Sequence, residues 1–100
     1  MRANYINNTT ANSKFLRAED ELRRIFEDKS IYEMSVWVRE HAQYLKWFCG
    51  FNEAKIEAVI QPFMQLSFYL YNNCKNDAEA IKDFREFCIK CIIELETNCR

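Results

Sequence analysis

The stretch SIYEMSVWVREHAQYLKWFCGF, residues 30–51, carries the clearest structural signals in this 100-residue chain. Ser30 followed by Glu33 fits a capping box, in which each side chain satisfies a backbone donor of the other residue. Gly50 closes the pattern, because glycine tolerates the left-handed conformation that ends many helices. Between these signals, residues recur at helical spacing along one side, and we expect them to face inward: Met34, Val38, His41, Leu45 and Phe48.

Two more amphipathic helices are expected, over residues 13–28 and from Asn52, as its cap, to about residue 74. The apolar stripe of the earlier helix consists of Phe15, Ala18, Leu22, Ile25 and Phe26. The later helix presents Ile56, Val59, Ile60, Phe63, Leu66 and Leu70, widened by Met64, Phe68 and Tyr71. Pro62 interrupts it on the polar side. Because proline removes one backbone hydrogen bond, we expect a kink or a split there.

A last helix is expected from Asp77 to about Thr97. Asn76 and Glu79 fit a second capping box at its start. Its apolar face consists of Ile81, Phe84, Cys88, Cys91, Ile92 and Leu95. The connections between the expected helices are short, so consecutive helices must run antiparallel.

These patterns predict an all-α fold, an antiparallel up-down four-helix bundle. One glycine and one proline are too few for the many turns of an all-β protein. At this length the chain is expected to form a single domain. We assign that domain to residues 13–100 and a flexible, disordered N-terminal arm to residues 1–12, which are polar and show no periodicity.

Charge and hydropathy argue against several kinds of partner. The net charge is −1, and lysines and arginines are scattered among acidic residues, which weighs against nucleic-acid binding. No stretch approaches the ~18 apolar residues of a membrane span, and the N-terminus lacks the apolar middle of a signal peptide. We therefore expect a cytoplasmic protein that binds neither nucleic acid nor membrane, with its 5 cysteines as free thiols.

The segment FCIKCIIEL, residues 87–95, contains a Cys-x-x-Cys pair that allows three interpretations. A redox pair is disfavoured, because Cys88 lies deep inside its helix, away from the N-terminal dipole that stabilises a thiolate. A metal site is an open alternative, since His41 would share a level with Cys88 and Cys91, although a closed zinc site needs four ligands. The third interpretation is that both cysteines are small core residues. We expect this third arrangement, and therefore no metal ligands.

No catalytic constellation is recognisable. A single histidine excludes a di-iron centre built from two Glu-x-x-His motifs. A single glycine excludes a glycine-rich phosphate loop. No nucleophile, base and acid occur at a supporting spacing. We expect a protein that is not an enzyme and carries no cofactor.

The residues expected to carry function lie on the outer side of the helix over residues 30–51. Val36 and Trp47 project nearly opposite Met34, about three helical turns apart. The expected partner-binding residues are this pair and its neighbours: Val36, Trp37, Glu40, Gln43, Tyr44, Trp47 and Phe51. Aromatic side chains on a polar-rimmed outer face are typical of contact surfaces, although burial within the monomer would also explain them.

We therefore expect a small protein-binding module that covers part of a larger partner, of the inhibitor or immunity type, neutralising a toxin or encoded by a phage or mobile element. The partner is another protein. One alternative is a structural or regulatory homodimer, in which the partner is a second copy of the chain. A second alternative is a metal-binding helical bundle at Cys88, Cys91 and His41.

Overall fold

The computed structural model describes residues 19–100. The expected arm over residues 1–12 and the expected start of the first helix at Ser13 lie outside this range, as do Phe15 and Ala18 of its stripe.

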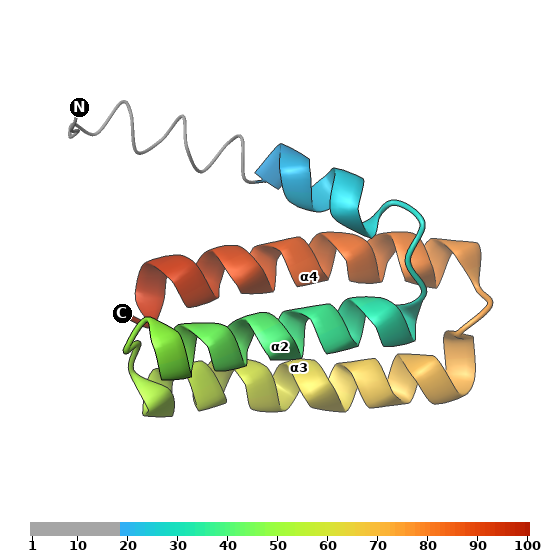
Figure 1. Cartoon of the computed structure of the whole chain (residues 1–100). Coiled ribbons are helices and arrows are strands. Elements are labelled where there is room, and N and C mark those ends of the chain that lie inside the picture. The colour runs from blue at the N-terminus through green and yellow to red at the C-terminus, as the bar shows by residue number, and fades with distance from the viewer. Residues whose placement is uncertain (1–18) are drawn as a thin grey trace.

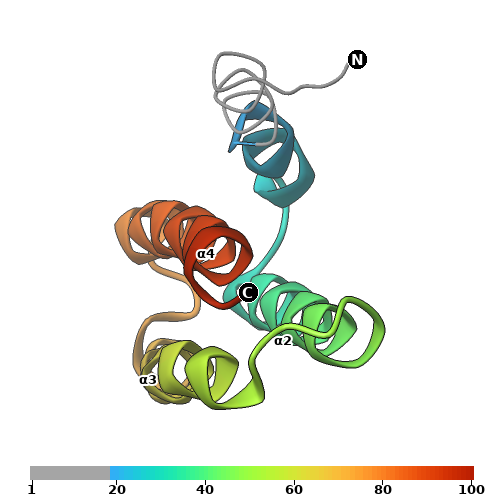
Figure 2. The same cartoon turned by 90° about the vertical axis from the view of Figure 1, so that its left-hand side faces the viewer.

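Three long helices make up most of the described chain: α2 (Ile31–Phe48), α3 (Glu53–Cys74) and α4 (Ala78–Asn98). Each runs opposite to the next helix along the chain (Figure 1). In the end-on view the three form a triangle, and a shorter helical segment, residues 19–26, lies outside it near α4 and α2 (Figure 2). The predicted all-α antiparallel bundle is confirmed. Its described part is a triangle of long helices with the first helical segment added on one side.

Polar and apolar contacts hold the first helical segment in place. Arg23 donates from Nε and Nη2 to the two carboxylate oxygens of Glu86 on α4, at 3.2 and 3.0 Å. Arg85, also on α4, donates to the carbonyl oxygens of Phe26 and Glu27, at 3.1 and 3.0 Å. These carbonyls lie at the end of the segment. The Phe26 carbonyl also accepts from the N–H of Lys29, at 3.1 Å, and Arg85 adds a side-chain cap to both. Phe26 itself is fully buried.

The predicted signals at the two ends of α2 are present in the structure. The backbone N–H of Ser30 donates to Glu33 Oε1 at 2.9 Å, and the N–H of Glu33 donates to Ser30 Oγ at 3.1 Å. The bond to Ser30 is the main reason that the pKa of the Glu33 carboxyl is lowered. At the other end Gly50 has a φ of 69°, in the left-handed region where a side chain would be strained.

The start of α4 differs by one residue from the prediction. Asn52 caps α3 as expected, but the cap of α4 is Asp77 rather than Asn76. Asp77 Oδ1 accepts from the N–H groups of Glu79 and Ala80, at 2.9 and 3.2 Å. A carboxylate in this position satisfies two free donors at once and also interacts favourably with the helix dipole.

Pro62 does not split the third helix, since α3 continues through it without a break. The ring lies on the exposed side of the helix. There, water can bond to the carbonyl group that loses its partner.

The core lies between the long helices and under the first helical segment. Its largest fully buried side chains are Phe26, Phe63, Phe84, Ile31, Met34, Ile56, Ile89, Ile92, Leu95 and Val38. The rings of Phe63 and Phe84 stack across α3 and α4 with centroids 5.6 Å apart. None of the helices in residues 19–100 is long and apolar enough to cross a bilayer.

Some residues expected on inward faces lie outside instead. Phe48 is exposed, and so are Phe68 and Tyr71 of α3 and Ile25 of the first helical segment. The buried residues of α2 face the space between α3 and α4, whereas Phe48 lies on the side of Tyr44 and stacks on that ring. The predicted stripes were therefore too wide and included residues at their edges that stay exposed, although the Tyr71 ring still meets Tyr32 of α2, with centroids 6.0 Å apart.

Candidate functional site

The predicted partner-binding residues divide into two groups in the structure. Glu40, Gln43, Tyr44 and Trp47 are exposed on α2. The other three, Val36, Trp37 and Phe51, are half-buried. The surface offered to a partner is therefore narrower than the predicted set and lies toward the C-terminal end of α2.

The half-buried members have neighbours within the chain. The ring of Trp37 meets Phe26 edge-on, with centroids 5.3 Å apart and planes at 87°. Phe51 packs against the core, its N–H donates to the carbonyl of Leu45 at 3.1 Å, and the Arg100 guanidinium lies 5.6 Å from its ring centroid. Trp37 and Phe51 thus contribute to the fold as well as to the surface.

A row of four rings runs along the side of α2, and we call it the ring ladder: Trp37, His41, Tyr44 and Phe48. Successive centroids lie 5.3, 6.1 and 5.8 Å apart, and each pair is stacked. His41 Nε2 lies 2.7 Å from Glu96 Oε2 on α4, and this pair holds the middle of the ladder against α4. The prediction missed Phe48 as a surface residue, although its spacing of four from Tyr44 was a signal for it.

Three exposed aromatic residues lie close together in sequence at this end of α2, and we call them the ring cluster: Tyr44, Trp47 and Phe48. Their exposed fractions are 53%, 67% and 78%. Lys46 Nζ lies 5.6 Å from the Trp47 ring centroid and 3.5 Å from Glu57 Oε2 on α3. The cluster is therefore mostly open to solvent and bordered by charged side chains.

The structure does not bring the thiols and the histidine into a metal site. Cys88 and Cys91 are buried in the core, and burial raises the pKa of Cys88 well above its usual range and that of Cys91 to about 11. Neutral buried thiols are poor ligands and poor nucleophiles. Residues 19–100 contain no group of three or more His, Cys, Asp or Glu side chains placed to hold a metal ion.

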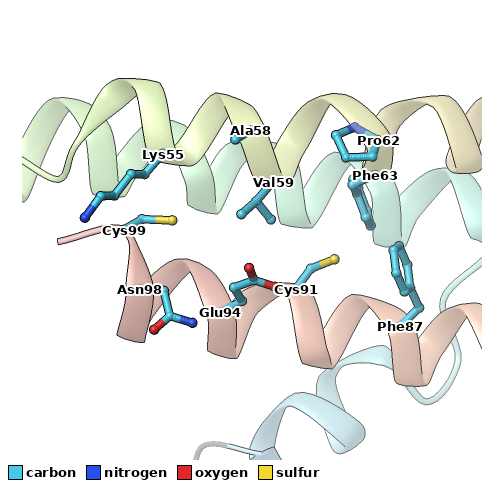
Figure 3. Close-up of a pocket in the computed structure, with 10 residues that line it drawn as sticks. All are labelled: Lys55, Ala58, Val59, Pro62, Phe63, Phe87, Cys91, Glu94, Asn98 and Cys99. Atoms are coloured by element: carbon cyan, nitrogen blue, oxygen red, sulfur yellow. The ribbon is translucent and has the colours of Figure 1, made fainter.

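A cavity of about 510 Å³ lies between α3 and α4. Figure 3 shows side chains of the two helices on its opposite sides, with Val59, Pro62 and Phe63 on α3 and Phe87 and Cys91 on α4. Its lining is largely apolar. Three polar residues, Lys55, Glu94 and Asn98, also line it. None of them joins a metal-binding group among residues 19–100, so we assign no chemistry to it.

Comparison with known proteins identifies no relative. No protein-family model matches the chain, and neither the curated proteins nor the solved structures contain a match.

Proposed function

We propose that this protein is a cytoplasmic, non-catalytic binding module that covers part of a larger partner protein, as inhibitors and immunity proteins do. The observation that carries the proposal is the ring cluster. Trp47 and Phe48 are adjacent in sequence, and both are mostly exposed at the end of a regular helix. Large aromatic side chains of this kind dominate the binding energy of protein interfaces.

The surroundings of the ring cluster support this proposal. Tyr44 and Phe48 are held by stacking within the ring ladder, and the ladder is fixed to α4 by the pair of His41 and Glu96. Because these two rings are already held, they lose little conformational entropy on binding. Glu40 and Gln43 are exposed on the same helix and would form part of a polar rim.

Affinity capture from the native host tests this proposal, with wild type compared with Trp47→Glu. Tyr69→Glu is the matched control, because Tyr69 is an exposed aromatic residue on α3, outside the ring cluster. We expect wild type and the control to capture the same protein at equal stoichiometry and Trp47→Glu to capture none. Equal capture by all three proteins would contradict the proposal.

The ring cluster also favours a second candidate, a structural or regulatory homodimer. An exposed apolar surface on a helix can pair with its own copy across a two-fold axis, the commonest symmetry of oligomers. This candidate predicts a solution mass twice that of the chain, reduced to the monomer mass by Trp47→Glu.

A further inference from the structure

The first helical segment is attached to the bundle differently from the long helices. α2, α3 and α4 each pack against both of the others, whereas the segment lies outside their triangle (Figure 2). Within residues 19–26, two side chains are buried, those of Leu22 and Phe26. By contrast, α2 and α4 bury six residues each. The described segment is therefore held by fewer buried side chains than either of these helices.

Two arginines make polar contacts between the segment and α4. Arg23 pairs with Glu86, but the two side chains are 42% and 45% exposed, and ion pairs that are open to water contribute little to stability. Arg85 bonds to the carbonyls of Phe26 and Glu27, where the segment leads into α2. A side chain of the bundle thus fastens the C-terminal end of the segment.

The ring of Phe26 covers one end of the ring ladder. It meets Trp37 edge-on, with centroids 5.3 Å apart, and Trp37 is the first of the four stacked rings. Phe26 is fully buried, so the two rings shield each other from water where they meet. Departure of the segment would therefore expose Trp37 and lengthen the row of exposed rings on α2.

We propose that the first helical segment is a detachable strap, which opens as one unit while the triangle of α2, α3 and α4 stays folded. Weakly held elements commonly open at a lower free energy than global unfolding requires. The closed strap withholds Trp37 from a partner, and the open strap adds this ring to the binding surface. This regulatory consequence rests on the proposed function, whereas the opening itself is a property of the isolated chain.

Native-state hydrogen exchange of the full chain in low urea tests the opening without a partner. The amides of residues 23–26 are expected to share one opening free energy. They should exchange at least about 10-fold faster, relative to their intrinsic rates, than the amides of Ile89 and Ile92 in α4. Their exchange should also depend less on urea, because opening of the segment exposes less surface than unfolding does. Equal protection and equal urea dependence in both sets of amides would overturn the proposal.

Two variants show whether the opening is separate from global unfolding. Arg85→Ala destabilises the closed state and is expected to speed exchange in both sets of amides about 10-fold, because hydrogen bonds from a charged group are lost. Ile56→Val trims the core at α3, across the triangle from the segment (Figure 2). It is expected to speed exchange at Ile89 and Ile92 about 5-fold, while residues 23–26 keep their wild-type rates. Faster exchange of residues 23–26 in Ile56→Val would contradict a separate opening.

Fluorescence shows whether the opening uncovers Trp37. All proteins in this experiment carry Trp47→Phe, so that Trp37 is the only tryptophan. Phe26→Asp is expected to hold the strap open, so that acrylamide quenches Trp37 more strongly while the circular dichroism of the long helices is retained. Ile25→Asp, at the exposed neighbour, is the control and should leave quenching unchanged. Unchanged quenching in Phe26→Asp, or loss of its helical signal, would overturn the strap, whereas failure to capture a partner would overturn the proposed function alone.

Discussion

Ser35 and Ser67 are both buried, but their hydroxyl groups meet different conditions. Ser35 bonds back to a carbonyl one turn earlier in α2, whereas Ser67 lacks a partner among the described residues. Burying a hydroxyl without a hydrogen bond costs about 1–3 kcal/mol. The two serines therefore allow the cost of an unmet hydrogen bond to be measured within one molecule.

Replacing Ser67 with alanine is expected to raise the free energy of unfolding by about 1 kcal/mol. The substitution removes the unpaired hydroxyl, and alanine favours the helix more than serine does. Ser35→Ala is the matched control. Its free energy of unfolding is not expected to rise, because the loss of the hydrogen bond to Ile31 offsets the higher helix propensity of alanine. Urea denaturation of both variants checks this. A clear loss of stability in Ser67→Ala would mean that the hydroxyl has a partner.

The buried thiols predict a loss of stability at alkaline pH. Thiols ionise near 9.0 when unperturbed, but burial raises the pKa of Cys91 to about 11. The folded state holds this proton more tightly than the unfolded state does. The resulting stabilisation of the folded state is therefore complete below pH 9 and is lost as the pH rises toward 11. We expect the urea midpoint to fall less steeply over this range in Cys91→Ala than in wild type.

The control for the thiol experiment is Cys49→Ala, which replaces an exposed cysteine and should keep the wild-type slope. An identical dependence of the urea midpoint on pH in wild type and Cys91→Ala would show that folding does not raise the pKa of this thiol.

Among the helices, the first helical segment is anchored mainly by the ring of Phe26. Phe26 is fully buried and contacts Trp37, whereas its neighbour Ile25 is 40% exposed. Phe26→Ala is expected to cost about 3 kcal/mol, because it leaves a cavity in the core. Ile25→Ala is expected to cost less than about 1 kcal/mol. Urea denaturation followed by tryptophan fluorescence measures both, and equal losses would contradict the assigned packing.

The helices were predictable where their signals are local. The capping box of Ser30 and Glu33, the cap at Asn52 and the left-handed Gly50 all depend on residues within one turn, so the sequence alone was enough to place them. The one-residue error at Asp77 arose between two adjacent residues that are both good caps.

The faces of the helices were less predictable, because they depend on neighbours that the pattern does not identify. Phe48 and Phe68 fit a helical stripe by spacing, but no other helix covers them. Ser67 is buried although it is polar, and a stripe of apolar residues does not include it. The partner-binding surface stays a prediction. Trp47 is exposed as expected, while Trp37 is half-buried and packs against Phe26.

For the whole molecule, the mass in solution distinguishes binding of a foreign partner from self-assembly. The leading proposal expects the isolated protein to remain a monomer of 12.1 kDa in sedimentation equilibrium over a wide range of concentrations. A mass that rises to twice this value in wild type, and not in Trp47→Glu, would favour the homodimer. In that case the ring cluster serves assembly and the inhibitor proposal fails.

Partner binding through Trp47 is tested by the affinity of the captured partner for Trp47→Glu and for Tyr69→Glu, measured by calorimetry alongside their urea midpoints. Loss of a central aromatic anchor typically costs about 2 kcal/mol or more. We therefore predict that Trp47→Glu weakens binding by at least about 30-fold with an unchanged urea midpoint, while Tyr69→Glu binds like wild type. Unchanged affinity of Trp47→Glu, or a loss of affinity matched by a fall in its urea midpoint, would contradict the claim that this surface exists for binding.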